Sequence, residues 1–247
     1  MRIMNTSTDW FASWFDTKFY HILYKHRDHK EARLFMANLV SFLHLKKGDN
    51  VLDLACGKGR HSVFLNSLGL DVIGADLSKN SIDYANQFKN DTLQFVQHDM
   101  REPIENRYDA IFNLFTSFGY FEDDSEDIQV LENIKNGLKN SDSVAIIDFL
   151  NVEYAVKNLV EKEVIVREEA TFNIKKSLNN GYIIKEIEVV VNGESSTYFE
   201  RIKYLDLPKM ESYLKKVGLK LKHTFGDYDL NEFDVSTSNR LILIISK

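Results

Sequence analysis

Apolar residues are spaced differently in three successive stretches of this chain. Up to about residue 47 they recur three or four positions apart, which is the period of a helix with one buried face. From residue 48 to about 150, short apolar runs alternate with further helical stretches. From about 164 to 205 the period falls to two, as in a strand with one buried face. The pattern predicts helices first, then an α/β unit, then an antiparallel sheet.

The first stretch is rich in aromatic residues. Seven of the fifteen residues from 10 to 24 are Phe, Tyr or Trp, and they recur near helical spacing. We expect an aromatic helix there and a second helix from about Asp28 to His44. Gly48 and Asp49 then end the second helix and turn the chain. The aromatic helix either packs on the edge of a sheet or covers a ligand as a lid.

The second stretch predicts a mostly parallel sheet, because crossovers between parallel strands need helices, which cover both faces of the sheet. The C-terminal segment adds the helix Pro208–Lys216, which has proline in its first turn and Gly218 past its end. Two final strands bring the expected total to seven. The predicted strands are Val51–Leu54, Asp71–Ala75, Leu93–Gln97, Ala110–Leu114, Val144–Phe149, Lys220–Thr224 and Leu241–Ile245, and the intervening helices are Arg60–Leu68, Lys79–Lys89 and Glu126–Leu138.

The third stretch carries two hairpin turns, Asn179-Asn180-Gly181 and Asn192-Gly193, whose residues tolerate positive φ. We expect three or four antiparallel strands, as an insertion, because the α/β pattern resumes afterwards. The expected fold class is α/β, with helices on both faces of the main sheet. The expected domains are an N-terminal helical cover, an α/β core and an inserted β subdomain, over residues 1–47, 48–150 with 206–247, and 151–205.

Composition narrows the classes of function. The 247 residues carry a net charge of −6, which counts against nucleic-acid binding, because that needs clustered Lys and Arg. Cys56 is the only cysteine, which excludes an intrachain disulfide and a cysteine-based zinc site, and we expect no bound metal. The N-terminus does not resemble a secretory signal, and no run of about 18 apolar residues occurs. We therefore expect a cytoplasmic protein that does not bind membranes.

A glycine turn carries the clearest chemistry. Gly57-Lys58-Gly59 follows the first buried strand, where a side chain would hold a ligand away from the backbone. Asp76 ends the second strand, and a carboxylate there can accept hydrogen bonds from both ribose hydroxyls. Asp53 lies inside the first strand, where a charge is unfavourable unless it is used. Ser62 stands where a dinucleotide-binding turn has its third glycine. The alternative is that both aspartates cap the helices that follow.

At these residues the chain resembles the class I S-adenosylmethionine-dependent methyltransferases. The segments VLDLACGKGRHS, GADLS, VQHDMR and DAIFNLFTSFGYF occur in the order and spacing of that superfamily's motifs, over about residues 48–150, with a similar ending at 206–247. The resemblance implies a Rossmann-like fold and S-adenosyl-L-methionine as the cofactor. The fourth strand ends in NLFTS and lacks the Asn-Pro-Pro-Tyr signature of DNA adenine methyltransferases. That departure counts against amino groups of nucleic acids as acceptors.

The resemblance also implies roles for individual residues. The methionyl moiety would lie beside Asp53 and the turn backbone, the ribose beside the acid that ends the second strand, and the adenine beside the next two strand ends. The residues at the end of the fourth strand would border the methyl group and the acceptor. In chain order, the residues implied to bind the cofactor are Asp53, Ala55, Cys56, Gly57, Gly59, Asp76, Leu77, Asp99, Met100, Asn113 and Leu114.

Four further residues are candidates for the reaction or for the cofactor. Tyr24, on the aromatic helix, would lie near the methionyl group if that helix is a lid. His26 and His98 are candidate general bases, since histidine titrates near neutral pH. Tyr120 follows the fourth strand, where its ring either packs a loop on the sheet or faces the cofactor's sulfonium.

The sequence thus supports methyl transfer to a small-molecule acceptor, with O, N, S and C acceptor atoms all open. A non-catalytic module that binds S-adenosylmethionine or S-adenosylhomocysteine is the alternative, with the inserted strands as a partner surface or a homodimer interface. A nicotinamide oxidoreductase is a third hypothesis, against which Asp53 and Ser62 count.

Overall fold

The computed structural model describes residues 10–24 and 29–247, and within them seven strands form the main sheet in the order β10-β11-β5-β4-β1-β2-β3. All are parallel except β11, which runs antiparallel to both of its neighbours. The predicted seven-stranded, mostly parallel sheet is confirmed. Its strands are β1 Asn50–Leu54, β2 Asp71–Asp76, β3 Leu93–Gln97, β4 Ala110–Asn113, β5 Val144–Leu150, β10 Lys220–Phe225 and β11 Arg240–Ser246.

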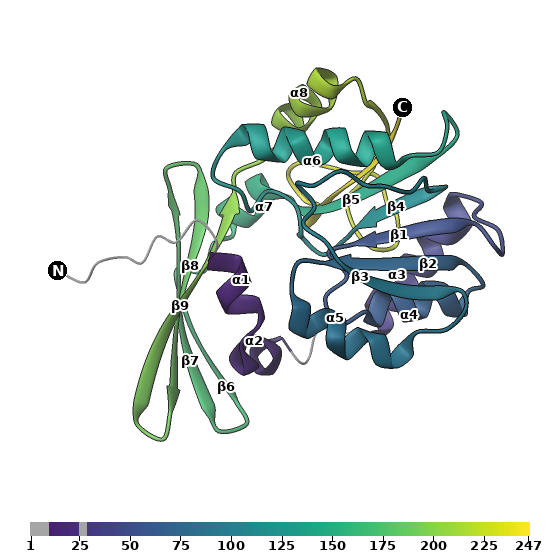
Figure 1. The fold of residues 1–247 in the computed structure, drawn as a ribbon. Coiled ribbons are helices and arrows are strands. Elements are labelled where there is room, and N and C mark those ends of the chain that lie inside the picture. The colour runs from purple at the N-terminus through teal and green to yellow at the C-terminus, as the bar shows by residue number, and fades with distance from the viewer. Residues whose placement is uncertain (1–9, 25–28) are drawn as a thin grey trace.

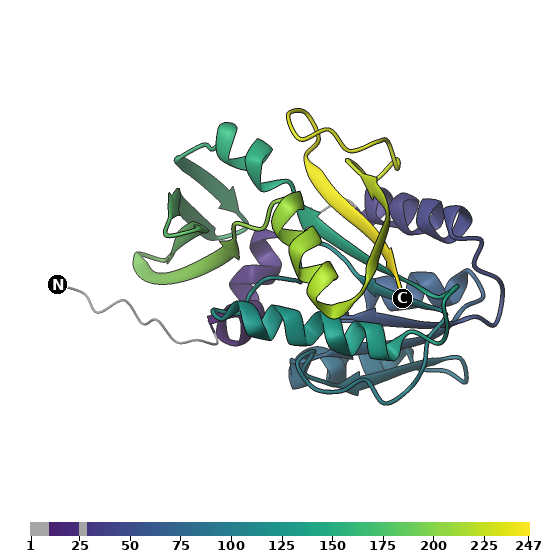
Figure 2. The ribbon, with the colours of Figure 1, turned by 90° about the horizontal axis from the view of Figure 1, so that it is seen from above.

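Helices cover both faces of this sheet (Figures 1 and 2). Helices α6 and α8 lie on one face, and α3, α4 and α5 lie on the other. Buried side chains from the strands point alternately into these two layers, because successive residues of a strand face opposite sides. The helices are α3 His29–Phe42, α4 Arg60–Ser67, α5 Lys79–Ala85 with the 3₁₀ turn η1 Asn86–Phe88, α6 Asp124–Gly137 and α8 Leu207–Val217.

A second sheet stands beside the core, at the left in Figure 1. Its described strands are all antiparallel, in the order β6-β7-β8-β9. Asn180 and Gly181, then Asn192 and Gly193, have positive φ at the two predicted hairpin turns. The antiparallel sheet is therefore confirmed, at the larger of the two expected sizes. Its strands are β6 Lys162–Arg167, β7 Ala170–Asn179, β8 Tyr182–Val191 and β9 Glu194–Lys203.

Local structure departs from the predicted pattern in two places. The aromatic helix is broken into α1 Trp10–Phe15 and α2 Lys18–Leu23, because the Thr17 side chain accepts a hydrogen bond from the Tyr20 amide and starts a new helix. A short helix that the periodicity did not predict, α7 Val152–Lys157, precedes β6. It is only six residues long, which is too short for a helical period to be seen.

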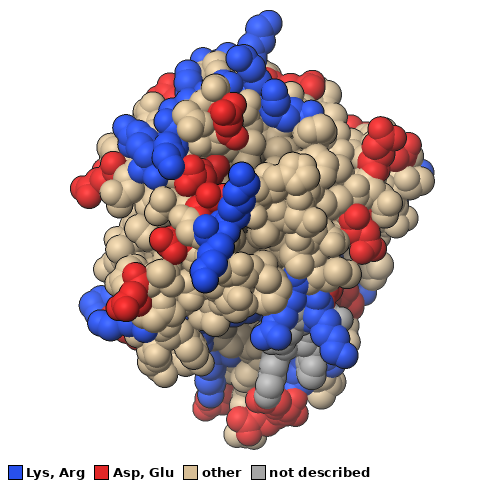
Figure 3. Space-filling view, turned by 90° about the vertical axis from the view of Figure 1, so that its right-hand side faces the viewer, with Lys and Arg blue, Asp and Glu red and all other residues tan. Residues whose placement is uncertain are grey.

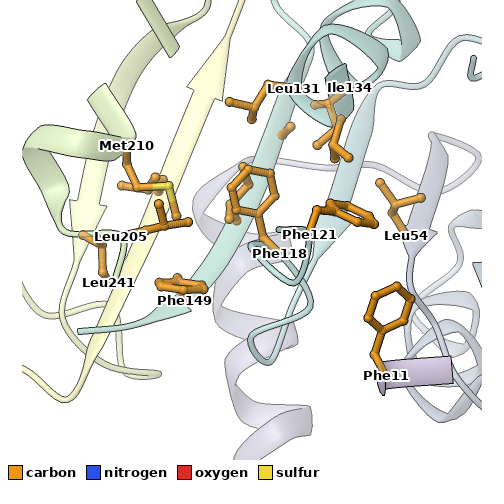
Figure 4. Close-up of a cluster of buried hydrophobic side chains, with 14 of the residues drawn as sticks. Phe11, Leu54, Phe118, Phe121, Leu131, Ile134, Phe149, Leu205, Met210 and Leu241 are labelled. Carbon is orange, nitrogen blue, oxygen red and sulfur yellow. The ribbon is translucent and has the colours of Figure 1, made fainter. Parts of the chain in front are cut away.

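Buried aromatic residues join α1 to the core (Figure 4). The figure shows Phe11 of α1 beside Leu54 and Phe121, while Leu131 of α6 and Met210 of α8 enter the same cluster. This cluster also includes buried residues of β7 and β8. The first helices, the main sheet and the second sheet thus share one continuous core.

On the face shown in Figure 3, basic and acidic side chains are interspersed among uncharged ones. None of the helices in the described part of the chain is long and apolar enough to cross a membrane.

Candidate active site

A large cavity opens where β1, β2, β3 and β4 end. Its volume is about 1300 Å³. One side is formed by the turn after β1 and the loops after the next strands, and the other by α1, α2 and residues of β7, β8 and β9. Ligands of open parallel sheets bind outside the carboxyl ends of the strands, so the cavity lies where the fold favours binding.

The turn after β1 brings the backbone to the edge of this cavity. Ala55, Gly57 and Gly59 all have positive φ, at 66°, 54° and 76°. A methyl group on Gly57 would meet no atom within 4 Å, so it would project into open space at the cavity wall. Gly59 lies behind the wall, and a methyl group there would come within 2.5 Å of the Phe95 ring. The missing side chain of Gly57 therefore leaves space for a ligand, whereas the missing side chain of Gly59 leaves space for the packed Phe95 ring.

The carboxylate in the first strand is buried and hydrogen-bonded. Asp53 is 2% exposed, and its Oδ2 accepts a hydrogen bond of 2.6 Å from the Ser62 hydroxyl. Burial raises the pKa of Asp53 to about 6, while the bond from Ser62 opposes that rise. The neighbouring Cys56 thiol has its pKa raised by burial, so it stays protonated at neutral pH. Ser62, which replaces a third glycine, thus supports Asp53 directly.

The carboxylate at the end of β2 organises the two loops around it. Asp76 accepts hydrogen bonds from the Gly57 amide at 2.7 Å and from the Ser78 amide at 2.8 Å. Burial raises its pKa, and these two bonds lower it in part. Ser78 is the N-cap of α5 and α4 has no side-chain cap, so neither Asp76 nor Asp53 caps a helix and the capping alternative is wrong. Asp76 lines the cavity, as does Leu77.

The carboxylate after β3 is held by arginine. Asp99 accepts hydrogen bonds from Arg101, the shortest of 2.6 Å, and Arg101 also pairs with Glu126 of α6 at 2.8 Å. Partial burial favours a higher pKa for Asp99, but the bonds from Arg101 lower it below its ordinary value. Asp99 and Met100 both line the cavity.

The two residues predicted at the end of β4 lie in different places. Leu114 lines the cavity. Asn113 is fully buried, is absent from the lining, and donates a hydrogen bond of 3.0 Å to the Leu54 carbonyl. The structure therefore places Asn113 behind the wall, where it links β4 to β1.

The loop after β4 has an unusual backbone. Phe115 and Thr116 have φ of 59° and 62°, a region that side chains rarely adopt, least of all β-branched ones. Both amides donate to Asp148 of β5, at 2.7 Å to its carboxylate and 2.9 Å to its carbonyl. Arg240 of β11 bonds the same carboxylate at 2.7 Å and the Thr116 hydroxyl at 2.9 Å. Strained backbone of this kind clusters at functional sites, where the surrounding structure holds it.

The candidate bases are placed as follows. His98 lines the cavity, and among the described residues its buried Nε2 has no hydrogen-bond partner. Tyr120 also lines the cavity and donates its hydroxyl proton to the Thr116 carbonyl. His26 lies outside the described residues.

A polar cluster at the second sheet was missed by the sequence analysis. Tyr24 donates to Glu200 of β9 at 2.7 Å, and Trp14 donates to the same carboxylate at 2.8 Å. Lys185 of β8 donates to the Tyr24 hydroxyl and to Glu200, the latter at 3.3 Å. Tyr24, Lys185 and Glu200 all line the cavity. The sequence does contain one indication of this cluster, because Lys185 interrupts a strand in which every second residue is otherwise apolar.

Residues 45–200, more than half of the chain, match the family model of the methyltransferase domain. The chain belongs to the class I S-adenosylmethionine-dependent methyltransferases. The chain shares 31% identity over 99 residues with YqeM of Bacillus subtilis (strain 168), a protein named as a methyltransferase, in a match that covers 38% of this chain and 40% of YqeM. It shares 35% identity over 111 residues with the glycine/sarcosine N-methyltransferase of Halorhodospira halochloris, covering 42% and 40%. The chain spans about two fifths of the length of these relatives.

A solved structure matches the fold over nearly its whole length. The S-adenosylmethionine-dependent methyltransferase from Clostridium acetobutylicum ATCC 824 superposes with a TM-score of 0.76 at 19% identity. The match covers 92% of this chain and 95% of that one. At this identity the likeness concerns the fold, and it includes both the sheet and the additions beside it.

The chemistry of the cavity wall fits the family's cofactor. S-adenosylmethionine carries hydrogen-bond donors along its length, in an ammonium group, two ribose hydroxyls and an adenine amine. The wall presents carboxylates at three successive strand ends, those of Asp53, Asp76 and Asp99. Gly57 adds the open space that a close ligand needs.

Proposed function

We propose that this protein transfers a methyl group from S-adenosylmethionine to a small-molecule acceptor bound in the same cavity. The observation that carries the proposal is the extent of that cavity. Its volume of about 1300 Å³ exceeds the roughly 300–1,000 Å³ typical of a site for one small ligand. It runs from the glycine turn to the face of the second sheet, which leaves room for two reactants.

The strand-end residues are proposed to hold the cofactor. Asp53 would bind its ammonium group, Asp76 its ribose and Asp99 its adenine amine, and Leu77 and Met100 would border the adenine. Each of these residues lines the cavity. Buried carboxylates bind such donors more strongly than exposed ones, because water competes less.

The acceptor is proposed to bind between the loop after β4 and the second sheet. Leu114 and Tyr120 line the first of these, and the aromatic residues of α1 and α2 lie between them and the sheet. We further propose that residues 1–47 and 151–205 act as the acceptor-binding parts of the molecule. The glycine/sarcosine N-methyltransferase acts, by its name, on small amines, which supports an acceptor of that size.

In this proposal the protein itself contributes little of the bond-making chemistry of methyl transfer. The cofactor, when bound, supplies a methyl group already activated on a sulfonium. The chain's part is to align the acceptor, exclude water and remove a proton from the acceptor where one must leave. Alignment alone can supply up to about 7–11 kcal/mol of the barrier. Aromatic rings beside a sulfonium add roughly 0.5–2 kcal/mol through cation–π contacts.

Turnover separates this proposal from a module that only binds the cofactor. The purified protein would be incubated with S-adenosylmethionine and panels of small amines, amino sugars, hydroxyl compounds and carboxylic acids, and S-adenosylhomocysteine would be quantified. The proposal expects its formation to depend on an added acceptor. Tight binding of S-adenosylhomocysteine without acceptor-dependent turnover in any panel would favour the binding module.

A further inference from the structure

The face of the second sheet that packs against the core is mostly apolar in its middle, where one row of charged residues crosses it, while Arg167 and Glu194 lie at one end of the same face. On β7 and β8, most alternate residues are buried apolar side chains that join the main core, and on β9 Tyr198 and Ile202 pack against that core. At one level the pattern breaks, with Lys176 on β7, Lys185 on β8 and Glu200 on β9. The buried apolar residues of this face on β7 and β8 are Ala170, Phe172, Ile174, Ile183, Ile187 and Val189.

The charges alternate at the ends of this row but not in its middle. Lys176 pairs with Glu163 of β6 at 3.0 Å, and Lys185 pairs with Glu200 at 3.3 Å. Lys176 and Lys185 stand directly opposite each other on neighbouring strands. The order across the sheet is therefore carboxylate, ammonium, ammonium, carboxylate.

Two like charges directly opposite in a sheet destabilise it. The other face of the same sheet also sets two lysines opposite each other, Lys162 of β6 and Lys175 of β7, but both are exposed to water, and Lys175 has an acid on its other side. There Lys175 stands opposite Glu186, and the two form an ion pair of 3.6 Å with side chains 63% and 42% exposed. On the inner face the Lys185 side chain is only 18% exposed, so water screens its charge much less. The repulsion between Lys176 and Lys185 is therefore weakened less by water than it would be on the outer face.

This row lines the cavity, at some distance from the cofactor turn. Lys185 lies 4.9 Å from the centre of the Tyr24 ring and donates to its hydroxyl. From Tyr24, ring contacts of 5.0, 4.9 and 5.6 Å run through Tyr20 and Phe15 to Tyr120, beside the loop after β4. Lys176 and Lys185 thus face the part of the cavity that the proposed function gives to the acceptor.

We propose that Lys176 and Lys185 together bind an anionic group of the acceptor, a carboxylate or a phosphate. An anion between the two ammonium groups turns one repulsion into two attractions and completes the alternation of charge across the sheet. Tyr24 and Glu200 are positioning residues, which hold Lys185 through hydrogen bonds. The inference rests on the proposed function, since it names a property of the acceptor in that site.

The test uses the protein saturated with S-adenosylhomocysteine, so that the cofactor's own sites are filled. Inorganic pyrophosphate and succinate serve as phosphate and carboxylate probes, titrated by calorimetry at low ionic strength. Binding should weaken about tenfold in Lys176→Met and in Lys185→Met, because each variant loses one charged hydrogen-bond donor. Lys175→Met, which removes a lysine from the outer face at the neighbouring position, should bind as the unaltered protein does. The probe that binds more tightly identifies the anion.

A second measurement does not depend on the variants folding. Amine acetylation of the unaltered protein, followed by mass spectrometry, should show that the favoured probe protects Lys176 and Lys185 and leaves Lys175 reactive. Three results would overturn the inference: no binding of either probe, equal binding in all variants, or displacement of S-adenosylhomocysteine by the probe. If either of the first two results occurs while S-adenosylhomocysteine still binds, the anion site is contradicted but the proposed cofactor site is not. Failure of this inference is thereby distinguished from failure of the proposed function.

Discussion

At the scale of single residues, the site is built from carboxylates in places that are unfavourable for charge. Asp53 is 2% exposed, and burial raises its pKa to about 6. Because this pKa is higher in the fold than the ordinary value of 3.8, protonation stabilises the native state. That contribution is present at low pH and is lost as pH rises through about 6. At neutral pH the carboxylate is mostly ionised, although burial disfavours its charge, and in this form it can bind an ammonium group.

Asp53→Asn tests this account through pH. In the unaltered protein, calorimetric affinity for S-adenosylhomocysteine should fall as pH drops from 7.5 to 5, because the carboxylate is neutralised near pH 6. The variant should bind about tenfold more weakly at pH 7.5, since a charged hydrogen bond is lost, and should lack this step. The two proteins differ only at position 53, so the difference between their pH profiles reports that residue alone. An unchanged affinity and pH profile in the variant would contradict the assignment.

The residues that sequence could predict are those whose chemistry is encoded locally. Asp53, Gly57 and Asp76 lie at fixed distances from strand ends, so their spacing alone brings them together. Lys185 and Glu200 meet Tyr24 across more than 150 positions of chain, and no local pattern encodes that contact. Some of these residues can still be noticed in the sequence. Asp53, Asp148 and Lys185 each interrupt an apolar strand, and each lines or supports the cavity.

At the scale of elements, the break between α1 and α2 has a structural consequence. Asp16 lies at the break, and its carboxylate accepts hydrogen bonds from the Ser78 hydroxyl at 2.5 Å and the Asn80 amide at 3.2 Å. Ser78 caps α5 and follows Asp76 and Leu77. The corner between the two short helices is thereby fastened beside the proposed ribose and adenine positions. A single continuous helix, as the aromatic periodicity predicted, would not present this corner.

Asp16→Ala should loosen that corner. We expect S-adenosylhomocysteine to dissociate several-fold faster, because two exposed hydrogen bonds to a charged group are lost, each worth a modest amount. The association rate and the melting temperature should change little. Stopped-flow displacement measures the dissociation rate, and Asp83→Ala, which removes an exposed ion pair from the same helix α5, is the control. Equal dissociation rates in the two variants would show that the corner does not retain the ligand.

Element prediction succeeded where the pattern was long and failed where it was short. The strands of the main sheet and helix α8, with its proline start and Gly218 end, agree with the sequence pattern within a few residues. The break at Thr17 and the six-residue α7 depend on single capping side chains, Thr17 and Asn151, and such caps change a helix boundary without changing hydrophobic period.

At the scale of the whole molecule, a buried ion pair ties the second sheet to the core. Lys203, the last residue of β9, bonds Asp127 of α6 at 2.5 Å, with side chains 7% and 0% exposed. Burial raises the pKa of Asp127 to about 6 even with Lys203 beside it. Lys209 pairs with Asp124 in the same region but is about half exposed. The position of the second sheet over the cavity thus depends in part on a pair that water does not screen.

Lys203→Met should lower the free energy of unfolding by about 3–5 kcal/mol at pH 8, because it leaves Asp127 charged and buried without its partner. The loss should shrink toward pH 5, where protonation removes the charge. Lys209→Met should cost no more than about 1 kcal/mol, as exposed pairs do. Urea denaturation measures both. Equal effects of the two variants would mean that the buried pair does not hold the sheet in place.

The central claim is that the strand-end cavity binds S-adenosylmethionine through the carboxylates around its glycine turn. Calorimetric titration of S-adenosylhomocysteine and of NAD into the unaltered protein, Asp76→Ala and Asp71→Ala tests it most directly, since Asp71 lies at the opposite end of the same strand. We predict that the unaltered protein and Asp71→Ala bind S-adenosylhomocysteine equally, that Asp76→Ala binds it at least about tenfold more weakly, and that NAD does not bind. Binding of NAD without S-adenosylhomocysteine, or full affinity in Asp76→Ala, would contradict the claim.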